Sequence, residues 1–174
     1  MADERYQAKK KAMDLLLHND RTEAELRERL LRKEFDADSV EDAVAYVKSF
    51  GYIDDERYAR NYVEFYRQRK SARQLAQDLQ RKGVDVMFIE SALSEAGSDE
   101  TALKRALEKK VSNPRKLAEY TYEEKQKVMA YLYRKGFQME DIHRVIPESA
   151  ILVSVTISAP FLISSFIVVT APFE

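Results

Sequence analysis

The sequence predicts an all-α protein made of three tandem three-helix repeats in an elongated, curved array, followed by an atypical apolar C-terminal tail. Three observations predict this fold: a recurring apolar and basic pattern, a helix-capping motif that opens each copy, and a Lys-Gly turn in the two later copies. The copies lie 49 and 53 residues apart, a period that is too long for a helical hairpin and that fits three helices per unit. The aligned positions are Leu26, Leu30, Arg32, Lys33, Phe35, Val40 and Val44; Leu75, Leu79, Arg81, Lys82, Val84, Ile89 and Leu93; and Val128, Leu132, Arg134, Lys135, Phe137, Ile142 and Ile146.

Each repeated helix opens with a capping box, in which a hydroxyl and a returning Glu or Gln side chain satisfy the free amides of the first turn. The distance from the capping residue to the first aligned apolar residue is four residues in two copies and seven in the last. We therefore expect nearly one extra turn in the last copy. The three boxes are Thr22 with Glu25, Ser71 with Gln74, and Thr121 with Glu124.

The ends of these helices follow the same pattern. Gly83 and Gly136 follow a lysine at the point where a left-handed residue commonly closes a helix, and Glu34 stands there in the first copy. The next helix of each copy is expected to be capped at Asp36, Asp85 and Gln138.

A third helix is expected before each pair, over residues 4–18, 55–70 and 99–111. Asp54 can cap the middle one. The sequence thus predicts nine helices and no strand before residue 147, with repeats at 1–50, 51–97 and 98–147 and a tail at 148–174. Because one such unit has a small core, we expect each copy to bury its apolar stripe partly on its neighbour.

The composition indicates a helical, mixed-charge protein, with 34% charged and 45% apolar residues among 174. The absence of cysteine excludes disulfides and thiolate metal sites, and with no sign of a signal peptide we expect a cytoplasmic protein. The two histidines, His18 and His143, have no partners at ligand spacing, and the acids at 54–56 suit helix capping better than metal binding. We expect no metal, no cofactor and no enzymatic activity.

Charge is unevenly distributed along the chain. Residues 21–57 hold seven basic against eleven acidic residues, whereas residues 57–82 hold eight against two and residues 103–135 hold ten against four. This asymmetry predicts that the second and third copies face an anion and the first a basic surface. Nearby aromatic residues such as Tyr62 and Tyr66 fit a core better than a stacking platform. The candidate binding residues are Arg67, Arg69, Lys70, Arg73, Arg81, Lys82, Arg134 and Lys135.

Four motifs carry a resemblance to a known family. They are the stretch 22–30, the Gly-Tyr-Ile-Asp-Asp-Glu-Arg-Tyr-Ala sequence at 51–59, the run 73–84 that ends in Arg-Lys-Gly-Val, and Leu-Tyr-Arg-Lys-Gly-Phe at 132–137. Over residues 8–146 the chain resembles the RecX family of bacterial recombination regulators. The resemblance implies a protein of DNA repair and the SOS response that binds RecA filaments on single-stranded DNA and lies along the filament groove. It also implies that the protein restrains ATP hydrolysis, strand exchange and coprotease activity, with no small-molecule substrate.

Two other functions remain open at this level. A helix pair joined by a tight turn is also typical of helix-turn-helix DNA-binding proteins, although residues 39–50 and 86–96 offer few side chains that read bases. A helical-repeat scaffold for protein partners is the third interpretation.

The tail has a different composition. Residues 149–173 carry no charge and are rich in Ile, Val, Phe, Thr and Ser. Pro160 and the lack of a following Lys or Arg argue against a membrane span, so a strand or hairpin that is prone to aggregation is expected.

Overall fold

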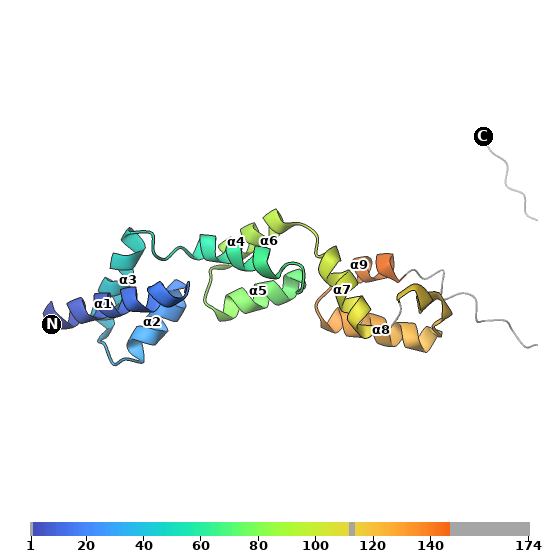
Figure 1. Cartoon of the computed structure of the whole chain (residues 1–174), viewed down its shortest axis with the longest axis horizontal. Coiled ribbons are helices and arrows are strands. Elements are labelled where there is room, and N and C mark those ends of the chain that lie inside the picture. The colour runs from blue at the N-terminus through green and yellow to red at the C-terminus, as the bar shows by residue number, and fades with distance from the viewer. Residues whose placement is uncertain (1, 112–113, 147–174) are drawn as a thin grey trace, which may run out of the picture.

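The computed structural model describes residues 2–111 and 114–146. Within these ranges the chain forms nine α-helices, one 3₁₀ helix and no strand, which confirms the predicted all-α class. Figure 1 shows the helices grouped as three triplets that follow one another along the long axis, so the molecule is elongated. The helices are α1 (Ala2–His18), α2 (Glu23–Leu31), α3 (Ala37–Ser49), α4 (Asp55–Tyr66), α5 (Ala72–Arg81), α6 (Val86–Ala96), α7 (Glu100–Lys110), the 3₁₀ helix η1 (Pro114–Glu119), α8 (Tyr122–Arg134) and α9 (Met139–Val145).

The local signals for helix starts are confirmed. Capping boxes open α2, α5 and α8, and Asp54 caps α4 through a bond from the Arg57 amide at 2.9 Å. Asp36 and Asp85 also cap their helices with the side chain, whereas Gln138 occupies the capping position of α9 without a side-chain bond. Helix α8 has 13 residues against 10 in α5, which confirms the extra turn expected in the last copy.

The core differs from the expectation. Each triplet has its own cluster of buried apolar residues, so the copies do not share their apolar stripes as expected; Ile53, at the start of the second repeat, is the exception and packs in the core of the first. All three helices of a triplet contribute to its core: α1 supplies Ala8 and Ala12 beside Leu26 and Val44 in the first repeat. The three stripes meet inside one triplet, and the contacts between repeats combine hydrogen bonds with close packing at the turn glycines.

In the residues that the structure describes, no helix is both long enough and apolar enough to cross a membrane. The strand or hairpin expected in the tail, at residues 148–174, lies outside the described residues.

Candidate functional site

Two equivalent joints connect the three repeats. The first joint lies between α2 and the turn after α5, and the second lies between α5 and the turn after α8. At the first joint the Thr22 hydroxyl donates to the carbonyl oxygen of Lys82 at 2.5 Å. At the second the Ser71 hydroxyl donates to the carbonyl oxygen of Lys135 at 2.7 Å. Each capping hydroxyl therefore serves its own helix and also binds the next repeat.

A second hydrogen bond repeats at both joints. The Asp55 carboxylate accepts from the backbone amide of Glu23 at 2.9 Å, and the Asp99 carboxylate accepts from the amide of Ala72 at 2.9 Å. A helix start has free amides and a positive dipole end, so a carboxylate from the next repeat stabilises it. Asp55 belongs to the motif at 51–59, which gives that motif a physical role in joining repeats.

The turn glycines are required by close packing at the joints. Gly83 has φ +77°, and a Cβ there would lie 2.3 Å from the Cβ of Ala24. Gly136 has φ +89°, and a Cβ there would lie 2.9 Å from the Ser71 Oγ. Glu34, the equivalent residue of the first copy, also has a positive φ of 65°, but its turn is exposed.

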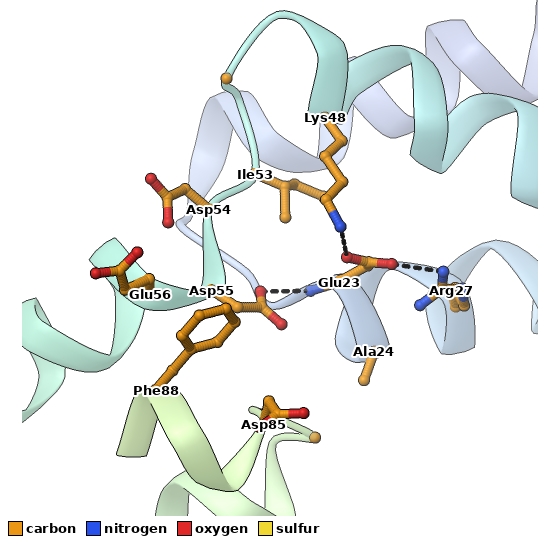
Figure 2. Close-up of a pocket in the computed structure, with 12 residues that line it drawn as sticks. Glu23, Ala24, Arg27, Lys48, Ile53, Asp54, Asp55, Glu56, Asp85 and Phe88 are labelled. Atoms are coloured by element: carbon orange, nitrogen blue, oxygen red, sulfur yellow. Dashed lines mark hydrogen bonds and ion pairs between the residues drawn. The ribbon is translucent and has the colours of Figure 1, made fainter. Parts of the chain in front are cut away.

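The first joint is acidic. It contains a pocket of about 550 Å³, shown in Figure 2, whose two cationic side chains both approach the same carboxylate. Lys48 Nζ lies 2.7 Å and Arg27 Nη2 lies 2.6 Å from Glu23 oxygens. The lining residues are Glu23, Ala24, Arg27, Lys48, Gly51, Ile53, Asp54, Asp55, Glu56, Gly83, Asp85 and Phe88. Five carboxylates thus face two cations that are already paired.

The pocket shifts the proton affinities of two carboxyl groups in opposite directions. The hydrogen bond from Lys48 holds the pKa of Glu23 below its ordinary value. Burial raises the pKa of Asp55, whose carboxylate accepts a hydrogen bond from the neutral Glu23 amide. An ionised Asp55 is therefore poorly compensated and favours the approach of a further positive charge.

The second joint has the same backbone framework and the opposite charge. Ala72, Gln74 and Gln138 stand where the first joint has Glu23, Glu25 and Asp85. Two adjoining hollows, of about 80 and 310 Å³, share Gln74 and Lys135, and no carboxylate lines either of them. Their lining residues are Arg69, Gln74, Arg105, Ala106, Lys109, Tyr131, Lys135 and Phe137 for the smaller, and Arg73, Gln74, Gln77, Tyr133, Arg134, Lys135 and Gly136 for the larger.

One pair of equivalent lysines illustrates the difference. At the first joint Lys82 Nζ lies 2.7 Å from a Glu25 oxygen, and although burial opposes it, this bond raises the pKa of Lys82. At the second joint Gln74 replaces that glutamate, and among the described residues no carboxylate is within ion-pair distance of Lys135. The charge of Lys135 therefore remains available to an anion.

Four of the eight predicted binding residues meet at the second joint: Arg69, Arg73, Arg134 and Lys135. No ion pair among the described residues engages any of these four side chains, so the second joint is a compact basic surface.

The other four predicted residues lie elsewhere and are engaged by carboxylates. Lys82 holds the first joint, Arg67 pairs with Glu64 at 3.2 Å, and Arg81 pairs with Asp78. Lys70 lies 2.5 Å from another Asp78 oxygen and over the rings of Tyr62 and Tyr66. Each of these four cations therefore has a carboxylate partner, although Lys70 and Arg81 share Asp78 and the Arg67 and Arg81 pairs are at the surface.

Arg105 and Lys109 of α7 were not among the predicted residues. They occupy positions i and i+4 and therefore share one face of the helix. Two basic residues four positions apart on a predicted helix indicate a basic face, and this pattern could have identified Arg105 and Lys109 from the sequence. In residues 2–111 and 114–146, no group of three or more His, Cys, Asp or Glu side chains could hold a metal ion.

The fold and the joints define the class: an all-helical tandem-repeat protein that presents an acidic and a basic surface at equivalent places. Family models for the first, second and third three-helix domains of RecX match residues 8–46, 54–93 and 98–146. The chain belongs to the RecX family, which confirms the resemblance found in the sequence.

Individual relatives agree with this assignment. Regulatory protein RecX from Pectobacterium atrosepticum is 33% identical over 140 residues, which cover 79% of this chain and 83% of the relative. Regulatory protein RecX from Clostridium botulinum is 30% identical over 141 residues, which cover 79% of this chain and 66% of the relative. The crystal structure of RecX from Lactobacillus salivarius matches the fold with a TM-score of 0.73 at 22% identity, over 85% of this chain and 97% of that one. The chain is thus related to proteins with a regulatory role.

Proposed function

We propose that this protein binds RecA filaments on single-stranded DNA and inhibits ATP hydrolysis, strand exchange and coprotease activity, with no chemistry of its own. Membership of a family whose members are named regulatory proteins supports a regulatory role. A ligand that binds one filament conformation more tightly than the other shifts the filament towards it. Inhibition follows when the favoured conformation is not the one that hydrolyses ATP. The cytoplasm is the compartment that this function requires.

The basic second joint is the observation that carries the proposal. Arginine forks and lysine ammonium groups are the usual partners of phosphate oxygens, and their affinity for a nucleic acid strand comes mainly from charge. Arg73, Arg134 and Lys135 line one hollow without any carboxylate. Tyr133, in the same hollow, is 53% exposed and could stack on a base. The joint thus fits a single strand held within a filament.

The shape of the molecule supports contact with more than one protomer. Three triplets with separate cores lie in a row (Figure 1), so the acidic and basic joints lie one after the other along the chain. Contacts that bridge neighbouring protomers depend on the filament conformation, which is the differential binding that inhibition requires.

The helix-turn-helix alternative is less well supported. A recognition helix needs exposed side chains that read base edges. Helix α6 contains no basic residue, and the lysine of α3, Lys48, is paired with Glu23. A helical-repeat scaffold for other protein partners would leave the ATP hydrolysis of the recombinase unchanged. The hydrolysis experiment below therefore distinguishes this alternative from the proposed function.

The test is the rate of ATP hydrolysis by the host RecA on single-stranded DNA as the protein is titrated in. We expect inhibition by the natural protein at substoichiometric amounts. The double variant R73E/R134E should need on the order of tenfold more protein, because it loses two phosphate contacts and adds two repulsive charges.

The matched control is R29E/R32E. Arg32 occupies the position of Arg134 in the first repeat, and both control side chains are exposed. The control should inhibit as the natural protein does. An unchanged hydrolysis rate with saturating natural protein would refute the proposed function, and equal inhibition by both double variants would refute the role of the second joint.

A further inference from the structure

An exposed aromatic cluster at the end of α3 is not explained by the fold. The rings of Tyr46 and Phe50 lie 5.0 Å apart, and those of Phe50 and Tyr52 lie 6.1 Å apart. These side chains are 40%, 61% and 51% exposed, respectively. Single exposed apolar residues are ordinary, but three exposed rings in contact form a patch of the kind found at interaction sites. We name Tyr46, Phe50 and Tyr52 the aromatic ridge.

The aromatic ridge adjoins the acidic pocket of the first joint. Gly51, which separates Phe50 from Tyr52, lines the pocket, and so do Ile53 and Asp54 directly after the ridge. Figure 2 shows this segment descending past Ile53 and Asp54 along one side of the pocket, with Phe88 below it, beside Asp55, and with Glu23 across from it. The segment that carries the ridge therefore continues directly into the wall of the pocket.

We infer that the aromatic ridge and the acidic pocket together dock a protein segment that presents a lysine or arginine side chain beside an apolar one. The inference rests on the proposed function, under which that segment belongs to a recombinase protomer. The cation enters the pocket and the apolar side chain packs on the ridge.

Charge decides against a nucleic acid at this surface. Aromatic rings can stack on bases, but a strand brings phosphates with it. The pocket holds five carboxylates, and its two cations, Arg27 and Lys48, are both bound to Glu23. Phosphates would be repelled there, whereas a positive side chain finds a complementary charge.

The chemistry of the pocket suits a long cationic side chain. Glu56 has a half-exposed carboxylate that pairs at the surface with Arg60 at 2.7 Å. Among the described residues no ion pair engages Asp55, which accepts from the Glu23 amide. The partly exposed ring of Phe88 offers apolar contact to the methylene stem that carries the charge. Aromatic and arginine contacts of this kind are the ones that dominate binding energy at protein interfaces.

The experiment measures three properties of the full chain: affinity for an immobilised RecA filament on single-stranded DNA, affinity for bare single-stranded DNA, and oligomeric state by sedimentation. The test variants are Phe50→Ser and Glu56→Lys. The controls are Tyr122→Ser, which removes an aromatic side chain of similar exposure (56%) from the third repeat, and Glu90→Lys, which reverses an exposed charge on α6. Helix content by circular dichroism verifies that each variant folds.

We expect each test variant to weaken filament binding roughly tenfold, as the loss of an interface anchor does, while binding to bare DNA stays unchanged. The controls should remain within twofold of the natural protein. Filament binding by both test variants at natural strength would overturn the inference and leave the proposed function standing. Loss of bare-DNA binding would identify a nucleic acid as the occupant, and a change in oligomeric state would identify a second copy; either would overturn the inference. Absence of filament binding by the natural protein would overturn the proposed function and the inference with it.

Discussion

The substitution Gly83→Ala tests whether the first joint is set by close packing. The added methyl group would lie 2.3 Å from the Cβ of Ala24, far inside van der Waals contact, on a residue with φ +77°. Gly51→Ala is the matched control, because Gly51 has a similar φ of +70° and a Cβ there meets nothing within 4 Å. The two variants share the backbone strain and differ in the steric contact between repeats.

The magnitudes follow from these two terms. A left-handed non-glycine residue costs about 1–2 kcal/mol, which is the expected loss of unfolding free energy for Gly51→Ala. Overpacking adds about 1–3 kcal/mol, so Gly83→Ala should lose about 2–5 kcal/mol. With a urea slope of about 2 kcal/mol per molar, the unfolding midpoint should fall by roughly 1–2.5 M for Gly83→Ala and by half a molar to one molar for the control.

Urea denaturation followed by circular dichroism at 222 nm measures both shifts. A double variant gives an independent check, because Ala24→Gly removes the atom with which the new methyl group collides. In the Gly83→Ala background it should restore part of the lost stability, although on its own it weakens α2 by about 0.5–1 kcal/mol. Equal midpoints for the Gly83 and Gly51 variants, with no rescue by Ala24→Gly, would refute the packing argument.

Three further predictions concern the joints. Ser71→Ala should lower the unfolding free energy by about 2–4 kcal/mol, because it removes a buried cap and leaves a carbonyl of the next repeat unpaired; Thr121→Ala, at an exposed cap without that bond, should cost only about 1 kcal/mol by the same denaturation assay. The hydrogen bond from Lys48 lowers the folded-state pKa of Glu23 below its ordinary value of 4.5, so this group stabilises the fold above that pH and loses its contribution as pH falls through the lowered value. Thermal melts between pH 7 and 3 should therefore show a smaller loss of stability for Glu23→Gln than for the natural protein, and parallel curves would contradict this. Gln74→Glu places at the second joint the carboxylate that neutralises the equivalent lysine of the first, and it should weaken binding to single-stranded DNA several-fold and reduce the salt slope by about one, as fluorescence anisotropy at several salt concentrations would measure.

The sequence predicts those parts of the fold that depend on neighbours in the chain. The three capping boxes and the left-handed turns are local features, and each lies where the pattern indicated. The sequence pattern predicts that Gly83 is left-handed, but it does not show that Gly83 must also lack a side chain because Ala24 packs against it. Ala24 is distant in sequence and comes close to the turn only in the folded protein. The separate cores were missed for a related reason: the repeat pattern recorded two helices of each triplet, and the third helix supplies the residues that close the core.

The binding residues show the same limit. Lys82 and Lys135 are equivalent in the repeat, and each is the lysine of an Arg-Lys-Gly sequence. Lys82 lies 2.7 Å from a carboxylate oxygen of Glu25, which is 57 residues away along the chain, whereas Lys135 lines a hollow together with Gln74, the residue equivalent to Glu25. The prediction from local charge therefore included both lysines as binding residues. The tertiary structure is needed to show that Lys82 is paired with Glu25 and that Lys135 lines hollows without a carboxylate.

The joints give the array a direction. Each is formed by the capping end of one repeat and the turn of the repeat that follows, so the two ends of the row are not equivalent. At the leading end the turn carries Glu34 at φ 65°, where both joints have a glycine because a Cβ there would lie too close to the adjoining repeat. At the trailing end the Thr121 hydroxyl, which lies 3.0 Å from its own Glu124 carboxylate, is exposed and has the same capping geometry as Thr22 and Ser71. Gene duplication could lengthen such a protein by adding units after the third repeat, whereas a unit placed before the first would also require a change at Glu34.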